Sequence, residues 1–121
     1  MSLESELFTA LKGLVANRVY PAVAPEATPT PYLTWQVTGG QAVNFMDGAQ
    51  PSKKNARIQV NVWSVSLAEA LKLAQQAETI LRGVATLSTT VQTGQFTRYE
   101  PDTHLHGTYQ FFSCWADISS S

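Results

Sequence analysis

The sequence predicts an α+β fold, a small mixed or antiparallel sheet of about four strands packed by two helices, in the order α-β-β-α-β-β. Three observations support this class. Apolar residues recur at steps of three and four over residues 2–16 and again over 67–81. Residues 57–65 alternate in the manner of a strand, and two later segments are rich in aromatic residues. A length of 121 residues favours one domain, spanning 1–121.

The first predicted helix covers residues 2–16, SLESELFTALKGLVA. Ser2 is able to cap its start, and Glu4 lies where the helix dipole is positive. Gly13 weakens the interior and marks either close packing or an early end. The apolar stripe consists of Leu3, Leu7, Phe8, Leu11, Leu14 and Val15.

A proline-rich segment, residues 21–31, follows this helix and is called the strap below. Each proline fixes its own φ near −65° and pushes the preceding residue toward extended geometry. We therefore expect a semi-rigid extended crossing, neither a helix nor a central strand, that holds the first helix at a fixed distance from the sheet. Its prolines are Pro21, Pro25, Pro29 and Pro31.

Two strands are predicted around a long irregular segment. Residues 32–38, YLTWQVT, are rich in strand-forming residues. Residues 39–56 contain turn signals and no periodicity, so they are predicted to be a long flexible loop. Residues 57–65 form the clearest strand, with one face made of Ile58, Val60 and Val62 and the other of Gln59, Asn61 and Trp63.

The second helix is predicted over residues 66–83. Ser66 followed by Glu69 is a capping box, and Gly83 marks the C-terminal stop. Two further strands are expected, at about 90–99 and 107–118. The narrow apolar face of the helix consists of Leu67, Ala70, Leu71, Ala74, Ala77 and Leu81.

The composition is low in charge. Only 14% of the residues are Asp, Glu, Lys or Arg, against a usual share of about 25%. A surface of this kind repels copies of itself weakly and suits a subunit of an assembly, although a plain neutral surface would look the same. The formal net charge of −1 gives no sign of sequence-specific nucleic-acid binding.

Cellular location is also constrained by the sequence. The single cysteine, Cys114, lies in an apolar run and is expected to be a small buried residue. The opening residues do not resemble a signal peptide, and no apolar run approaches the roughly 20 residues that a membrane helix needs. We expect the chain to begin in a bacterial cytoplasm, with no membrane partner.

Support for catalysis or metal binding is thin. His104 and His106 are two residues apart, so in a strand both side chains would share one face, as in some metal sites. No further ligand follows a known metal spacing, and no nucleophile elbow, zinc-protease motif or phosphate loop is present. The sequence predicts no enzyme, no cofactor and no metal. A small ligand- or metal-binding module, with hydrolytic activity near His104 and His106, remains the alternative.

Three segments together resemble the bacteriophage tail-completion family, whose members are related in fold to the tail terminators of long-tailed phages. They are NRVYPAVAPEATPTPYLTWQ, ARIQVNVWSVSLAEALKLAQQ and RYEPDTHLHGTYQFFSCW. The resemblance rests on the order and spacing of motifs over most of the chain. The matching positions are Arg18 to Pro21, Pro31 and Tyr32, Arg57 to Trp63, Glu69 and Ala70, and Gly107 to Tyr109.

This resemblance implies a structural role in virion assembly. Such a protein caps the growing tail tube, ends its polymerisation and joins the tail to the head, acting as a closed ring that often has six copies. The implied partners are other copies of the chain, the tail tube protein and the head–tail connector proteins. The implied places are the host cytoplasm during assembly and then the tail or neck of the virion.

Contact residues follow as hypotheses. In the expected loop, Phe45 and Met46 are apolar residues with no strand or helix to account for them, so we expect this loop to contact partners and to become ordered on assembly. Lys53, Lys54 and Arg57 form a basic cluster that either lines the contact or is simply solvated. The mixed polar and aromatic face of Gln59, Asn61 and Trp63 is the candidate subunit interface.

Overall fold

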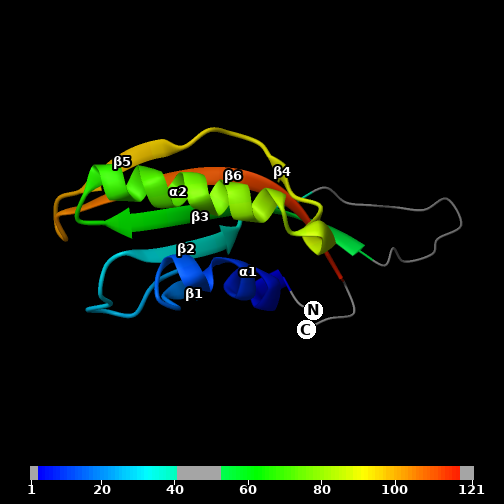
Figure 1. Ribbon diagram of the computed structural model, residues 1–121, viewed down its shortest axis with the longest axis horizontal. Helices are drawn as coiled ribbons and strands as arrows, with labels where there is room; N and C mark the ends of the chain where they lie inside the picture. Colours follow the sequence, from blue (N-terminus) through cyan, green and yellow to red (C-terminus); the bar gives the residue numbers. More distant parts are fainter. Residues whose placement is uncertain (1–2, 41–52, 118–121) are drawn as a thin grey trace, which may run out of the picture.

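The computed structural model describes residues 3–40 and 53–117 and confirms the α+β class (Figure 1). One sheet carries two α-helices and two short 3-10 helices. In chain order the elements are α1 (Leu3–Leu11), η1 (Lys12–Leu14), β1 (Val19–Pro21), β2 (Tyr32–Val37), β3 (Lys53–Ser64), α2 (Leu67–Arg82), η2 (Ala85–Leu87), β4 (Thr90–Val91), β5 (Phe96–Glu100) and β6 (Leu105–Asp117).

The sheet is mixed and is built around its two longest strands. Its order is β1-β2-β3-β6-β4, and β5 pairs with β6 as well. β3 and β6 run antiparallel along their whole length, from Lys53 opposite Asp117 to Ser64 opposite His106. β1 pairs in parallel with β2, and the other pairs are antiparallel.

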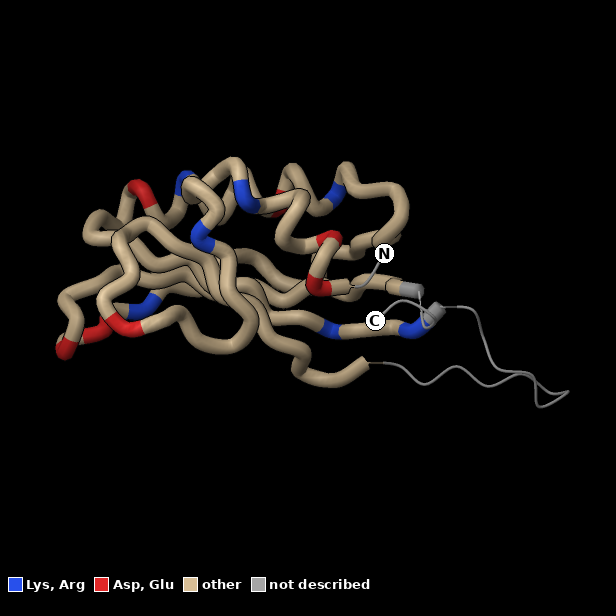
Figure 2. The backbone as a smooth tube through the Cα atoms, turned by 90° about the horizontal axis from the view of Figure 1, so that it is seen from below, with Lys and Arg blue, Asp and Glu red and all other residues tan. Residues whose placement is uncertain are grey.

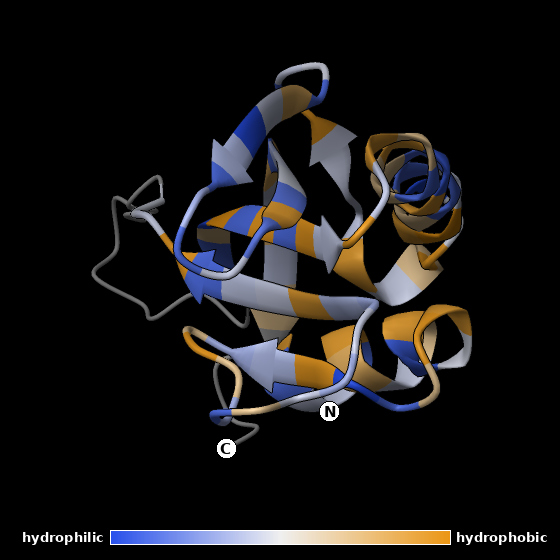
Figure 3. Cartoon of the chain, turned by 90° about the vertical axis from the view of Figure 1, so that its left-hand side faces the viewer, coloured by the Kyte–Doolittle hydropathy of each residue, from blue (hydrophilic) through white to orange (hydrophobic). Residues whose placement is uncertain are grey.

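Both helices cover the same face of the sheet, which leaves the other face open (Figures 1 and 3). Alternation along β3 turns Ile58, Val60 and Val62 toward the helices, as predicted, and all three are buried. Alanines on α2 allow close approach of the helix to the strands. The core is formed mainly by Leu7, Leu11, Val15, Leu33, Trp35, Ile58, Val60, Val62, Ala70, Ala74, Ala77, Leu81, Leu87, Phe112 and Cys114.

The described part of the chain holds six strands, where the sequence predicted about four. One additional strand is β1, at the start of the strap. The other arises because the expected strand at 90–99 is interrupted. Between the pairs Val91–Phe112 and Phe96–Tyr109 lie four residues on the edge side and two on β6, so the edge strand bulges and divides into β4 and β5.

The strap has a different role from the one predicted. It connects two parallel neighbours, because β1 before it pairs with β2 after it, Val19 lying opposite Leu33. The Arg18 Nε–H donates to the Pro31 carbonyl at 2.9 Å and closes the base of the loop. The strap therefore forms a loop at the sheet edge and does not act as a spacer between helix and sheet.

The helix predictions are right in position and differ in detail. α1 ends at Leu11, and the chain tightens into η1 around Gly13 before Ala16 and Asn17 adopt positive φ. In α2 the Ser66 hydroxyl accepts a hydrogen bond from the Glu69 N–H, which is one half of the predicted capping box. The Ser66 N–H donates to the Ser64 hydroxyl, which in turn donates to the Glu69 carboxylate. The predicted apolar face is shifted toward Leu73, which is buried, while Leu67 and Leu71 are each 39% exposed.

The prediction of a loop over residues 39–56 is wrong at its C-terminal end. β3 begins at Lys53, so residues 53–56 belong to the longest ladder of the sheet, opposite the last residues of β6. The polar sequence SKKNA does not look like a strand, but strand pairing satisfies backbone groups whatever the side chains are, so β3 extends through it.

Neither described α-helix combines the length and the apolar composition that crossing a membrane requires.

Candidate functional site

The uncovered side of the sheet, called the open face below, is the main candidate for contact with partners. Odd-numbered residues of β3 and β6 project to this side, since even-numbered ones face the helices. Cross-strand pairing places residues from four strands in adjacent rows. The open face consists of Tyr32, Thr34, Gln36, Arg57, Gln59, Asn61, Trp63, Phe96, Arg98, Glu100, Gly107, Tyr109 and Phe111.

A ladder of uncharged polar side chains forms one half of the open face. The Gln36 amide donates to Gln59 Oε1 at 3.2 Å, and the Gln59 amide donates to Asn61 Oδ1 at 2.9 Å. The Asn61 amide in turn donates to the Thr34 hydroxyl at 3.1 Å. Each amide still has hydrogen-bonding capacity left, so the ladder is ordered and able to bind polar groups of another chain.

Aromatic rings form the other half. Phe96 stacks on Tyr109 with ring centroids 4.9 Å apart, and Phe111 meets Tyr109 edge to face at 6.3 Å. The Arg57 guanidinium lies 4.5 Å from the Phe111 ring centroid, and its Nε–H donates to Gln92 Oε1 at 2.8 Å. These contacts fix a cation on an aromatic surface.

Trp63 connects the two halves. Its ring lies directly over Gly107, where an added Cβ would sit 2.7 Å from a ring carbon. The guanidinium of Arg98, on β5, lies 5.4 Å from the Trp63 ring centroid. Gly107 therefore provides the space that lets Trp63 lie flat across β6.

A hollow of about 310 Å³ lies between the strap and this tryptophan. Ala22, Val23 and Ala24 of the strap line one side and Arg98 the other, over the polar ladder. Tyr32 also lines it, and partial burial raises the pKa of this phenol, which keeps it neutral and able to donate. The open face therefore contains a hollow as well as a mixture of polar and aromatic side chains.

Charged residues are spread along the chain without a large region of one sign (Figure 2). The charged side chains of the open face include Arg57 and Arg98, each held against an aromatic ring, and Glu100, whose carboxylate lies 3.9 Å from the Arg98 guanidinium. A surface of amides, aromatic rings and arginine, poor in lysine and acids, has the composition of protein–protein contacts. The arrangement supports binding.

The predicted contact residues do not all lie together. Gln59, Asn61 and Trp63 share the open face. Lys53 and Lys54 are residues of β3, not of a loop, and alternation places Lys54 on the opposite face from Arg57. The predicted basic cluster is therefore divided.

Phe45 and Met46 lie outside the described residues. The open-face residues that sequence reasoning missed include Phe96, Arg98, Tyr109 and Phe111. Alternation within GTYQFF would have indicated that Tyr109 and Phe111 share a face, but their position beside Gln59 and Asn61 depends on the β3–β6 register.

The two histidines both contact Tyr99. The Tyr99 hydroxyl and His104 Nδ1 are 3.0 Å apart, and the His106 ring lies 4.9 Å from the Tyr99 ring. His104 has φ of 56° in the turn before β6, so the pair does not lie on one strand. Within the described residues, no group of three or more His, Cys, Asp and Glu side chains is placed to hold a metal ion.

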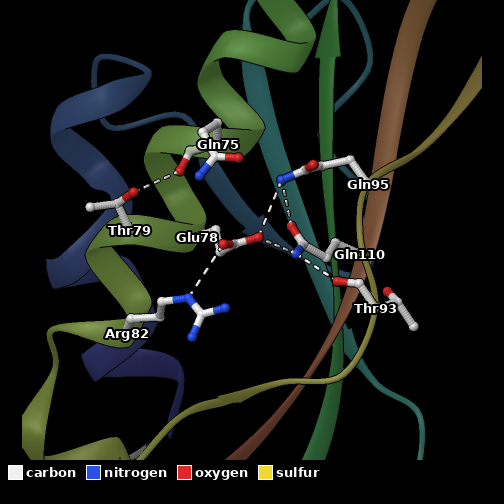
Figure 4. A network of polar contacts seen from close by, with 7 residues as sticks. All are labelled: Gln75, Glu78, Thr79, Arg82, Thr93, Gln95 and Gln110. Atoms are coloured by element: carbon white, nitrogen blue, oxygen red, sulfur yellow. Dashed lines mark hydrogen bonds and ion pairs between the residues drawn. The ribbon is translucent and has the colours of Figure 1, made fainter.

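A partly buried network around the Glu78 carboxylate joins α2 to the strands (Figure 4). The Gln110 amide donates to Glu78 Oε1 at 2.7 Å and to the Thr93 carbonyl at 2.8 Å. Gln95 donates to Gln110 Oε1 at 3.2 Å, and Arg82 to Glu78 Oε2 at 3.3 Å. The Gln110 hydrogen bond, helped by Arg82, holds the pKa of Glu78 below its ordinary value.

This network has a structural role, because its partners are amides and an arginine that leave Glu78 ionised at neutral pH. Cys114 is buried as predicted, and burial raises the pKa of its thiol. A thiol with a raised pKa carries little thiolate and is a poor nucleophile.

Comparisons with known proteins agree with the fold. In the solved virion of a native gene transfer agent particle, a chain with 13% sequence identity has the same fold, with a TM-score of 0.60. The alignment covers 96% of this chain and 95% of that one. A search of curated proteins finds no match. The sequence matches the family described as Tail completion protein gp17 over residues 6–116, and the chain therefore belongs to this phage tail-completion family.

Proposed function

We propose that this protein caps the phage tail tube, ends its polymerisation and joins the tail to the head. Membership of the tail-completion family over residues 6–116 is the observation that carries the proposal. The protein acts by fitting surfaces together, and no bond is made or broken. It works without cofactor or metal, in the host cytoplasm during assembly and then in the tail or neck of the virion.

The active form is a ring of copies, six in the simplest case. A contact between two different surfaces of the same chain closes into a ring when its rotation is right. The open face, with Gln59, Asn61 and Trp63, is one of these surfaces. Apart from Glu100, which lies beside Arg98, its side chains are neutral or are cations stacked on rings, so covering them removes little charge from water.

A ring gains affinity for the tube by multivalency. A stable contact between two subunits needs roughly 800 Å² on each partner. Once the ring has formed, several modest contacts with the matching tube end act together and raise the overall affinity. The segment that carries Phe45 and Met46, together with Lys53, Lys54 and Arg57, is the proposed contact with the tail tube protein or the head–tail connector. Lys54 and Arg57 lie on opposite faces of β3, so they serve different neighbours.

Tail assembly with charged variants tests the proposal. In the genome that encodes the chain, deleting its gene is expected to give tails of uncontrolled length that are not joined to heads. Complementation with Gln59→Arg should fail, because a third arginine on the open face breaks the polar ladder and adds repulsion. Tail length and head attachment are measured by electron microscopy.

Gln76→Arg is the matched control. Gln76 is an exposed residue of α2, on the helical side of the molecule, so the same chemical change there leaves the open face intact. This variant should restore normal joined tails. Normal tails from the deletion strain contradict the function, whereas normal tails from Gln59→Arg contradict only the interface.

A further inference from the structure

One edge of the sheet is closed by its own chain. β1 offers Val19 and Pro21 to the outside, because Arg18 and Ala22 bond to β2. The Val19 N–H donates to the Asn17 carbonyl at 3.0 Å, and Pro21 has no N–H. The Pro21 carbonyl accepts from Val23 at 2.7 Å. An incoming strand therefore finds no free donor on this edge.

The opposite edge, β5, has no such protection. Gln92 donates to the Phe111 carbonyl, so odd-numbered residues of β6 bond toward the edge. In antiparallel register this assigns Phe96, Arg98 and Glu100 to bonds with β6. The backbone groups of Thr97 and Tyr99 then point outward, and among the described strands β5 pairs with β6 alone.

The side chains on this edge are unusually exposed for their type. Phe96 is 45% exposed and Tyr99 is 50% exposed. The five residues of β5 contain no proline, and the exposed aromatic rings lie on both faces of the strand. An edge with free backbone groups and apolar side chains is a template for another strand.

We propose that β5 pairs antiparallel with β5 of a second copy, about a two-fold axis at Tyr99. In this register Tyr99 faces the second Tyr99, and the two residues exchange both backbone hydrogen bonds. Each exposed Tyr99 ring is then covered by its counterpart. The adjacent positions place Arg98 directly opposite Glu100 of the other copy, twice by symmetry.

The charges make β5 complementary to itself. Arg98 Nη2 and Glu100 Oε2 of one chain lie 3.9 Å apart on the same face of the strand. Bringing a second copy into this register makes a square of alternating charges, in which each arginine neighbours two carboxylates. A register that places Arg98 opposite Arg98 would be repulsive, and one centred on Thr97 would set Arg98 opposite Phe96. Only the pairing centred on Tyr99 places Arg98 opposite Glu100, so the charge pattern favours it.

This contact differs from the proposed ring contact. A two-fold contact uses the same surface on both copies and closes after two, whereas a ring needs two different surfaces. The pairing would cover the β5 edge of a free chain before assembly. It uses β5 backbone, whereas the ring uses the polar ladder of the open face, so the two contacts are separable by mutation.

Analytical ultracentrifugation of the full chain over a dilution series tests the pairing. The natural chain is expected to sediment as a concentration-dependent dimer. Arg98→Glu or Glu100→Arg alone should raise the dimer dissociation constant by about tenfold, since each turns two attractive cross-strand pairs into repulsive ones. The double variant Arg98→Glu with Glu100→Arg restores opposite charges and should recover the dimer.

Thr97→Pro gives an independent test of the backbone pairing. In the proposed register the outward Thr97 N–H lies opposite Pro101 of the second copy and donates to its carbonyl. Proline at position 97 removes this bond without removing a bond to β6. The Thr97→Pro variant should be folded by circular dichroism and monomeric by ultracentrifugation, whereas Thr97→Ala should stay dimeric. A natural chain that is monomeric at every concentration overturns the proposal. So does an oligomer that is lost with Gln59→Arg but unaffected by both Arg98→Glu and Thr97→Pro.

Discussion

At the scale of single residues, the pair Trp63 and Gly107 determines the shape of the open face. The two residues are directly opposite in the β3–β6 ladder. The indole ring occupies the space that a side chain on residue 107 would take, and it supports the Arg98 guanidinium from below. A glycine that weakens a strand in isolation is therefore favourable here, because it lets a large ring cover the backbone.

Replacing this glycine should be costly. Gly107→Val is expected to lower the free energy of unfolding by about 1–3 kcal/mol, because the new methyl groups force Trp63 off its rotamer. Chemical denaturation measures the loss, and a shift in tryptophan emission reports the moved ring. Valine is the better strand former, so a net loss identifies the steric conflict as its cause.

Gly94→Val is the control for that substitution. A Cβ added at Gly94 meets no atom within 4 Å, so its effect should stay within about 0.5 kcal/mol. Equal losses from the two variants would mean that the Trp63 contact is not what makes Gly107 special.

At the scale of elements, the Glu78 network holds α2 against β6 and against the bulged edge between β4 and β5. Gln110 is 3% exposed and donates to both Glu78 and the Thr93 backbone. One amide therefore connects a helix, the central strand and the edge segment. The edge that carries Phe96 and Arg98 depends on this anchor for its position.

Removing the charge at Glu78 should weaken the fold in a pH-dependent way. Glu78→Gln is expected to lower the free energy of unfolding by about 1–2 kcal/mol at neutral pH, because a charge-assisted hydrogen bond is lost. The pKa of Glu78 is lower in the folded chain than in the unfolded one, where it is about 4.3. Its contribution is therefore present above that value and disappears as the pH falls through the folded pKa.

Urea unfolding at several pH values measures this difference. The gap between the natural chain and Glu78→Gln should be constant near neutrality and should shrink below about pH 4. Glu26→Gln, on the exposed strap, is the control and should change the stability by less than about 0.5 kcal/mol. A gap that persists unchanged in acid would show that the Glu78 charge is not responsible.

At the scale of the whole molecule, the described residues form a two-layer body in which both α-helices lie on one face of the sheet and no described helix covers the other. Helices fill one side with apolar contacts, and the other side presents amides, rings and stacked arginines. Low charge content makes such a face easier to remove from water. This division fits the proposed assembly, in which a neighbouring subunit covers the second face.

Deleting residues 43–50 should separate folding from function. The described residues contain a core of their own, built from both helices and the sheet. The Gly39 carbonyl accepts from the Arg57 N–H at 2.8 Å, so the ends of β2 and β3 are close enough for a short connection. The shortened chain should keep its circular dichroism spectrum and cooperative unfolding. It should fail to give tails of normal length in the complementation assay. Loss of folding would count against a partner-contacting role for this segment.

The sequence by itself determined the features that depend on neighbours along the chain. The capping box at Ser66, the alternation of Ile58, Val60 and Val62, and the burial of Cys114 all follow from local periodicity and composition. The motifs that resemble the tail-completion family were equally readable, because their order and spacing are properties of the chain.

Only the tertiary structure decided how distant segments meet. The β3–β6 register places Gln59 beside Phe111 and Trp63 over Gly107, and it extends β3 back to Lys53 through a polar segment. The bulge that divides β4 from β5 and the closure of the β1 edge are likewise set by partners far away in sequence. Backbone pairing satisfies any side-chain pattern, so the face that meets a partner is fixed by register and not by local preference.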